Sequence, residues 1–185
     1  MVRSNSILRE RLQHITCAAE ASVDSHPGLV ADLAAEIPHS IELVPGAHCP
    51  PTERYNCFEF ALGLAGRREV RLISEHLPST FCDGSFVQCL VDSVLIPTAS
   101  PSTGDLVLYR NHQLIRHAGL VQGRRIMSKW GKGHVWLHGL LEVPAQYGDA
   151  TSFYEVPSQN ETLANFIEFA REREGREFVD SVLDL

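Results

Sequence analysis

The sequence predicts an α+β domain in which helices pack on one antiparallel sheet, and two observations support this class. Apolar residues recur at helical spacing through the first half of the chain and again near its end. Between these parts, residues 105–130 contain short runs rich in Val, Leu and Ile that are separated by turn residues, as in an antiparallel meander. Helices followed by strands in this order are typical of the α+β class.

The length of 185 residues suits a single domain with its own hydrophobic core. Hydrophobic residues make up 44% of the chain and charged residues 21%, a balance typical of folded rather than disordered proteins. We therefore expect one domain over residues 1–185. Its parts are a helical N-terminal extension over residues 1–40, a core over residues 55–157 and a C-terminal helix over residues 158–185.

The N-terminal extension is expected to hold two helices. Apolar residues recur every three or four positions over residues 6–22, and Ser6 is available as the N-cap. A second, shorter helix ends before Pro38. Residues 38–55 are rich in Pro and are expected to form a loop.

A third helix is predicted over residues 56–66, and its first turn holds the first candidate for chemistry. Asn56 is a good N-cap, and Glu59 three residues later completes the pattern of a capping box. Gly66 supplies a stop signal. Cys57 would then be the first residue of a capped helix.

The rest of the chain is expected to form one more helix, then strands, then a last helix. The further helix spans residues 85–95, and a loop rich in Pro and Ser follows it. Ser158 and Glu161 form a capping box before the last amphipathic helix. Strands are expected at residues 105–109, 117–121, 125–130 and 151–156.

Charge and cysteine usage limit the class of partner. The formal net charge is -7 and the 16 Lys and Arg residues are scattered, which argues against a nucleic-acid partner. The five cysteines are odd in number and include no C-x-x-C pair, so reduced thiols are expected. Because there is neither a signal-peptide pattern nor an apolar run of about 20 residues, we expect a cytoplasmic chain with no membrane partner, unless a specialised secretion system exports it.

Cys57 is the candidate nucleophile, because unpaired N–H groups and the helix dipole at a helix start favour a thiolate. The same N–H groups can stabilise the oxyanion that forms when sulfur attacks an acyl carbon. The alternative is a small buried apolar residue, as most reduced cysteines are. Cys17 and Cys89 lie on apolar helical faces and are expected in the core, while Cys49 and Cys82 are expected in loops.

His117 is the candidate base, and it opens the predicted strand HAGLV. The small residues Ala118 and Gly119 would let a helix or a substrate approach this strand closely. The alternative is a histidine at the end of a strand that forms hydrogen bonds at the surface. His112, by contrast, is expected in a hairpin turn.

Three segments together resemble the NlpC-type group of papain-like cysteine hydrolases, which are bacterial cell-wall endopeptidases and related amidases. That family's pattern is a capped helix that begins at a Cys, then G-D-L-V with two aromatic or apolar residues, then a strand that begins H-x-G. The resemblance covers roughly residues 55–130 and implies a papain-like fold and a thiol mechanism that uses no cofactor. The matching segments are Asn56-Cys57 with FEFALGL, Gly104-Asp105-Leu106-Val107 with Leu108-Tyr109, and His117-Ala118-Gly119.

The resemblance also implies a third polar residue on the strand after the base, which fixes the orientation of the imidazole. Ser128 occupies this position, and His134 and His138 are alternatives if the turn at residues 131–133 folds back. The spacing of His134 and His138 also suits two metal ligands on a helix. No third ligand is evident and glycines flank the pair, so no metal site is expected.

Four residues near these positions are expected to contact a substrate: Tyr55, Asn56, Trp130 and His138. For the tryptophan, packing in the core is the alternative to a place in the wall of a cleft.

The resulting hypothesis is a cysteine peptidase, amidase or deamidase that acts on an amide, isopeptide or related acyl bond of a peptide or protein. One alternative is a secreted toxin or effector of the same fold, a deamidase or acyltransferase, with an immunity or regulatory protein as partner. The other alternative is a non-catalytic binding module that retains the fold.

Overall fold

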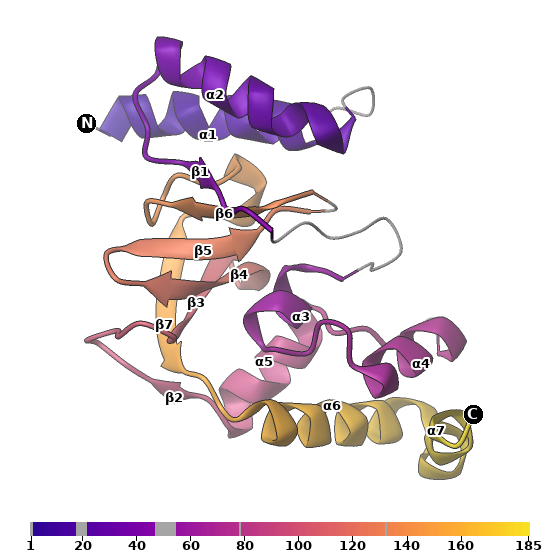
Figure 1. The fold of residues 1–185 in the computed structure, drawn as a ribbon. Helices are drawn as coiled ribbons and strands as arrows, with labels where there is room; N and C mark the ends of the chain where they lie inside the picture. Colours follow the sequence, from indigo (N-terminus) through magenta and orange to yellow (C-terminus); the bar gives the residue numbers. More distant parts are fainter. Residues whose placement is uncertain (1, 18–21, 47–54, 78, 132) are drawn as a thin grey trace.

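The computed structural model describes residues 2–17, 22–46, 55–77, 79–131 and 133–185, which form one sheet with helices at both ends (Figure 1). Within the described residues the sheet has seven strands in the order β1-β6-β5-β4-β3-β7-β2. Each neighbouring pair of strands is antiparallel. The predicted α+β class is therefore confirmed.

The helices and strands have the following bounds. The helices are α1 (Val2–Cys17), α2 (His26–Glu36), α3 (Cys57–Ala61), α4 (Arg68–His76), α5 (Gly84–Ser93), α6 (Gln159–Glu174) and α7 (Arg176–Leu183), with short 3-10 helices η1 (Val23–Ser25) and η2 (Ala145–Tyr147). The strands are β1 (Glu42–Leu43), β2 (Ile96–Pro97), β3 (Leu106–Asn111), β4 (Leu114–Gln122), β5 (Arg125–Lys129), β6 (Val135–His138) and β7 (Ala150–Glu155).

The predicted meander forms the centre of the sheet as β3, β4 and β5. A tight turn joins β3 to β4, and His112 in this turn has a φ of 55°, in keeping with its predicted turn position. The predicted strand at 151–156 is also present, as β7 paired with β3. Strand β6 and the two-residue edge strands β1 and β2 were not predicted, because short strands carry too few residues for a clear alternation.

Several helix boundaries differ from the prediction. The first helix begins at Val2, so Ser6 lies inside it, and its hydroxyl donates to Glu10 instead of capping the helix. Helix α3 ends at Ala61, and the unpredicted α4 follows. The C-terminal helix is divided at Gly175, whose φ of 93° ends α6 and starts α7. Residues 18–21 and 47–54, where part of the first helix and of the long loop were predicted, lie outside the described residues.

Two hydrophobic cores lie on opposite faces of the sheet. Figure 1 shows α1 and α2 together at one end of the molecule and α3 to α7 at the other. The first core lies against α3 to α7 and includes Phe58, Phe86, Leu108, Ala118 and Phe166. The second core lies against α1 and α2 and includes Leu12, Val30, Tyr109, Trp130 and Tyr147.

The register of β3 and β4 shows to which core each side chain belongs. Leu108 is paired with Ala118, and both belong to the first core. Tyr109 of the second core is paired with His117. Because residues directly opposite in an antiparallel pair project to the same face, the His117 side chain lies on the face of the second core.

Candidate active site

Cys57 begins α3 because Asn56 caps this helix, as predicted. The Asn56 Oδ1 accepts the backbone N–H groups of Phe58 at 2.8 Å and Glu59 at 3.0 Å. In return, the Glu59 carboxyl group accepts the backbone N–H of Asn56, which completes a capping box. The Asn56 Nδ2 also donates to the carbonyl of Cys82 at 2.7 Å, so the start of α3 is fixed to the loop before α5.

The thiol of Cys57 lies against β4. The backbone N–H groups of Ala118, Cys57 and Phe58 lie close enough to the sulfur to lower the pKa of the thiol, and so does the positive charge of Lys129. Burial of the sulfur outweighs these contributions and raises the pKa of the thiol to about 11. The residue as a whole is half-buried, and because its pKa is raised the sulfur is a protonated thiol at neutral pH.

Cys57 can lie against β4 because the pairing between β4 and β5 ends close to this point. The paired residues of β4 and β5 run from Gln122↔Arg125 to Leu120↔Met127 and stop there. The N–H of Ala118 lies beyond the last pair, and α3 packs against both strands at this point. The sulfur thus lies close to a backbone N–H of β4 beyond the last residue pair with β5.

Lys129 is part of this site, although the sequence did not predict it as a site residue. Its side chain is buried, and Nζ donates to the carbonyls of Gly131 at 2.8 Å and Gly133 at 3.0 Å. The ammonium group also lies 5.1 Å from the ring centre of Tyr55, a cation–π contact. Tyr55 precedes Cys57 by two residues, so a buried cation is held beside the start of α3. No local pattern marked this lysine, because β5 also contains the polar residues Arg125 and Ser128.

Glu59 adds a group that titrates near neutral pH. Burial raises the pKa of its carboxyl group to about 7, although the N–H of Asn56 and the charge of Lys129 oppose the shift. Burial, followed by the charges of Glu59 and Cys57, raises the pKa of the Cys82 thiol as well. The first turn of α3 therefore combines a thiol, a titrating carboxyl group and a cation.

His117 is not hydrogen-bonded to Cys57. Its ring stacks on Tyr147 with 3.9 Å between centroids and 7° between planes, and Tyr109 lies 5.5 Å away. Neither ring nitrogen has a hydrogen-bond partner among the described residues. Burial, with a smaller effect of His138, holds the pKa of His117 well below its ordinary value, so the imidazole is neutral. The expected contact between sulfur and imidazole is absent, because the register turns the ring toward the second core.

Ser128 orients His138 and not His117, so this part of the prediction is wrong. The Trp130 indole N–H donates to Ser128 Oγ at 3.1 Å, and this hydroxyl donates to His138 Nε2 at 2.8 Å. The His138 Nδ1 donates to the carbonyl of Gly139 at 2.8 Å, which leaves Nε2 as the acceptor. Burial lowers the pKa of His138 to about 4.

Two of the predicted substrate contacts are buried in this arrangement. Trp130 is 1% exposed and His138 is 0% exposed, so neither can line a cleft in this conformation. Both rings belong to the packing of the second core, and their centroids lie 5.5 Å apart. Tyr55 and Asn56, in contrast, are half-buried beside Cys57 and remain candidates for contact with a substrate.

The remaining candidates have structural partners. His134 Nε2 donates to the carbonyl of Val23 at 3.1 Å and so links β6 to η1. Among the described residues, no group of three or more His, Cys, Asp or Glu side chains could hold a metal ion. Cys89 is exposed, so its expected place in the core is wrong, whereas Cys82 lies in the loop before α5 as expected and is buried. Cys89 is exposed because it lies on the outer face of α5.

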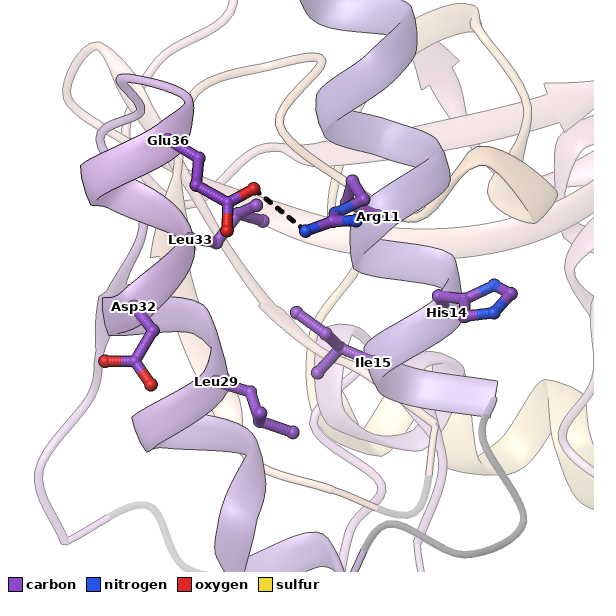
Figure 2. A pocket seen from close by; sticks show the side chains of 7 residues that line it. All are labelled: Arg11, His14, Ile15, Leu29, Asp32, Leu33 and Glu36. Carbon is purple, nitrogen blue, oxygen red and sulfur yellow. Dashed lines mark hydrogen bonds and ion pairs between the residues drawn. The ribbon is translucent and has the colours of Figure 1, made fainter.

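A groove also runs between α1 and α2 on the side of the second core (Figure 2). Ile15, Leu29 and Leu33 line it, and an ion pair of 2.9 Å between Arg11 and Glu36 crosses it. Both charged side chains are more than half exposed, so the pair contributes little to stability. This groove belongs to the N-terminal helices and not to the thiol site.

In comparisons with known proteins, no family model, no curated protein and no solved structure matches this chain. Across the described residues, the helices are too short or too polar to cross a membrane.

Proposed function

We propose that this chain is a cytoplasmic thiol hydrolase of papain-like fold, with Cys57 as nucleophile and a peptide or protein as substrate. The observation that carries the proposal is the place of the sulfur. It lies at the start of a capped helix and close to the N–H of Ala118, the residue directly after His117. The sulfur and the proposed base thus lie at adjacent residues of β4, with the imidazole on the face of the second core, and this closeness along β4 supports the resemblance noted in the sequence.

In the proposed reaction, the thiol proton of Cys57 passes to the neutral imidazole of His117, and the sulfur attacks the carbonyl carbon of an amide, isopeptide or related acyl bond. N–H groups at the start of α3 stabilise the oxyanion. The imidazolium then protonates the leaving amine, and water hydrolyses the thioester. An amine acceptor in place of water would make the same site an acyltransferase.

His117 must leave its stack on Tyr147 before it can take this proton. In the arrangement described here, a thiol with a pKa of about 11 faces an imidazole whose pKa is held low by burial, so both groups are neutral. This is a resting state, and catalytic contacts in unliganded enzymes are often formed only when substrate binds. Solvation of the imidazole would raise its pKa toward the ordinary range and make it a competent base.

A second candidate function is a non-catalytic binding module. The specific observation in its favour is the absence of a hydrogen bond from any described residue to the His117 ring nitrogens. A thiol without an engaged base would be retained for packing against the first core.

Thiol labelling distinguishes the two candidates. The experiment uses a Cys89→Ala background, since Cys89 is exposed and would react with any alkylating reagent. Iodoacetamide labelling of each remaining cysteine is followed by peptide mass mapping, with and without His117→Ala. The hydrolase predicts that Cys57 reacts faster than buried Cys82 and that His117→Ala slows it by about tenfold or more. The binding module predicts a different result. Cys57 and Cys82 would then be labelled equally slowly, and His117→Ala would not change either rate.

A further inference from the structure

A second groove, of about 550 Å³, lies between the first turn of α5 and the hairpin that joins β3 to β4. Its floor is rigid because Gly84, the first residue of α5, lies directly on the backbone of β4. A side chain at Gly84 would clash with the carbonyl oxygen of Ile115. Phe58, Asp83, Gly84, Ser85, Gln88 and residues 113–116 line the groove.

Sequence neighbours of both proposed catalytic residues line this groove. Phe58 directly follows Cys57, and Arg116 directly precedes His117. Arg116 is the extra residue of a β-bulge, since Tyr109 pairs with His117 and the next residue of β3 pairs with Ile115. A bulge redirects a side chain, and Arg116 is exposed at the groove.

Three arginines surround the groove without a carboxylate partner. Arg116 lines it, Arg110 Nη1 donates to Gln88 Oε1 at 2.9 Å, and Arg173 Nη1 donates to Ser85 Oγ at 3.2 Å. None of the three forms an ion pair with any side chain in the described part of the chain. In a chain with a net charge of -7, three unpaired arginines at one groove indicate an anionic ligand.

The acidic side chains of this region do not cancel that charge. Asp83 Oδ1 accepts the N–H groups of Ser85 and Phe86 and the hydroxyl of Ser85, so this carboxylate caps α5. Asp92, further along the same helix, accepts the Gln88 amide at 2.7 Å. Both carboxylates are engaged within α5, and the arginines are left for a ligand.

We propose that this groove binds an acidic peptide segment of the substrate, with a carboxylate facing Arg116. The proposal rests on the proposed function, because it makes the groove the approach to the Cys57 site. Exposed Leu114 offers an apolar contact, while the Gln113 side chain presents a polar group suited to a peptide backbone. A nucleic acid fits less well, because the groove's one aromatic side chain, Phe58, is buried and offers no stacking surface.

Binding can be measured without turnover in the Cys57→Ala chain. The probes are two fluorescein-labelled octapeptides, one of alternating Glu and Ala and one of alternating Gln and Ala, followed by fluorescence anisotropy at low ionic strength. The Glu peptide should bind at least about tenfold more tightly, and Arg116→Gln should remove most of this difference. The matched control is Arg124→Gln, an exposed arginine in the turn after β4 that does not line the groove.

Three results would overturn this inference. They are equal binding of the two peptides, an equal loss of binding in Arg116→Gln and Arg124→Gln, and complete competition by a single-stranded oligonucleotide of the same charge. The last would show a general polyanion surface. Circular dichroism checks that Arg116→Gln is folded. Since the measurement needs no thiol, its failure would leave the Cys57 labelling result unaffected, and the two proposals are tested separately.

Discussion

The free energy of unfolding should fall between pH 7 and pH 5, and it should fall less in the His117→Phe variant than in the wild-type protein. The imidazole is fully buried, and its pKa is held well below the ordinary 6.5, first by burial and then by His138. Phenylalanine can keep the stacked contact with Tyr147, at 3.9 Å between ring centroids, but cannot bind a proton. The variant therefore removes the titration and keeps the ring.

The sign and size of the effect follow from proton linkage. Below pH 6.5 the unfolded chain protonates this histidine while the folded chain does not, so stability is lost as the pH falls. Each pH unit below the unfolded pKa costs about 1.4 kcal/mol, and pH 5 is about 1.5 units below it. The wild-type protein should thus lose about 2 kcal/mol more than His117→Phe.

Urea unfolding at pH 7 and pH 5 and at constant ionic strength measures this difference. Carboxyl groups also titrate in this range, but they are common to both proteins and cancel when the two pH dependences are subtracted. His112→Gln, in the exposed hairpin turn, is the control and should keep the wild-type pH dependence. If His117→Phe and wild type lose the same free energy of unfolding, the imidazole is solvated in the folded state and its stack on Tyr147 is not the resting conformation.

Two further substitutions test the local structure by urea unfolding at pH 7. Asn56→Ala removes the side chain that accepts two N–H groups of α3 and should cost about 1 to 2 kcal/mol. Asn56→Asp keeps the cap and loses the donor to the Cys82 carbonyl, so it should cost less than Asn56→Ala. A cost near zero for Asn56→Ala would mean that the cap does not hold α3. Ser128→Ala leaves the Trp130 N–H and the His138 Nε2 buried without their partner and should cost about 1 to 3 kcal/mol. No loss of stability in Ser128→Ala would show that this chain of hydrogen bonds is not formed in solution.

The sequence predicted those features that depend on residues close together in the chain. Asn56 and Glu59 form a capping box within four residues, so the helix start at Cys57 could be recognised directly. The same holds for the Ser158 cap, whose hydroxyl accepts the N–H of Glu161. The short β-prone runs bounded by turn residues marked the central strands β3 and β4 correctly. Each of these signals is local, and local geometry determines it.

The orienting residue and the buried cation could not be predicted in this way. Ser128 was assigned to His117, but its hydroxyl reaches His138 on β6, a strand too short to be recognised. Lys129 is charged and would ordinarily be placed at the surface. It is buried because two carbonyls of the following turn accept its protons and because Tyr55 packs on it. Those partners come together only when the sheet has formed.

By itself the sequence determined that Cys57 starts a capped helix, because hydrogen bonds between near neighbours specify the cap. It also placed His117 in a strand, but at its start, whereas β4 begins three residues earlier at Leu114. The tertiary structure alone decided how these two residues face each other. Helix α3 packs on the face of Ala118, where β4 and β5 separate, while the pairing of β3 with β4 turns His117 toward Tyr109 and Tyr147. Which face of a strand a helix covers depends on packing between distant segments, and no local pattern encodes that choice.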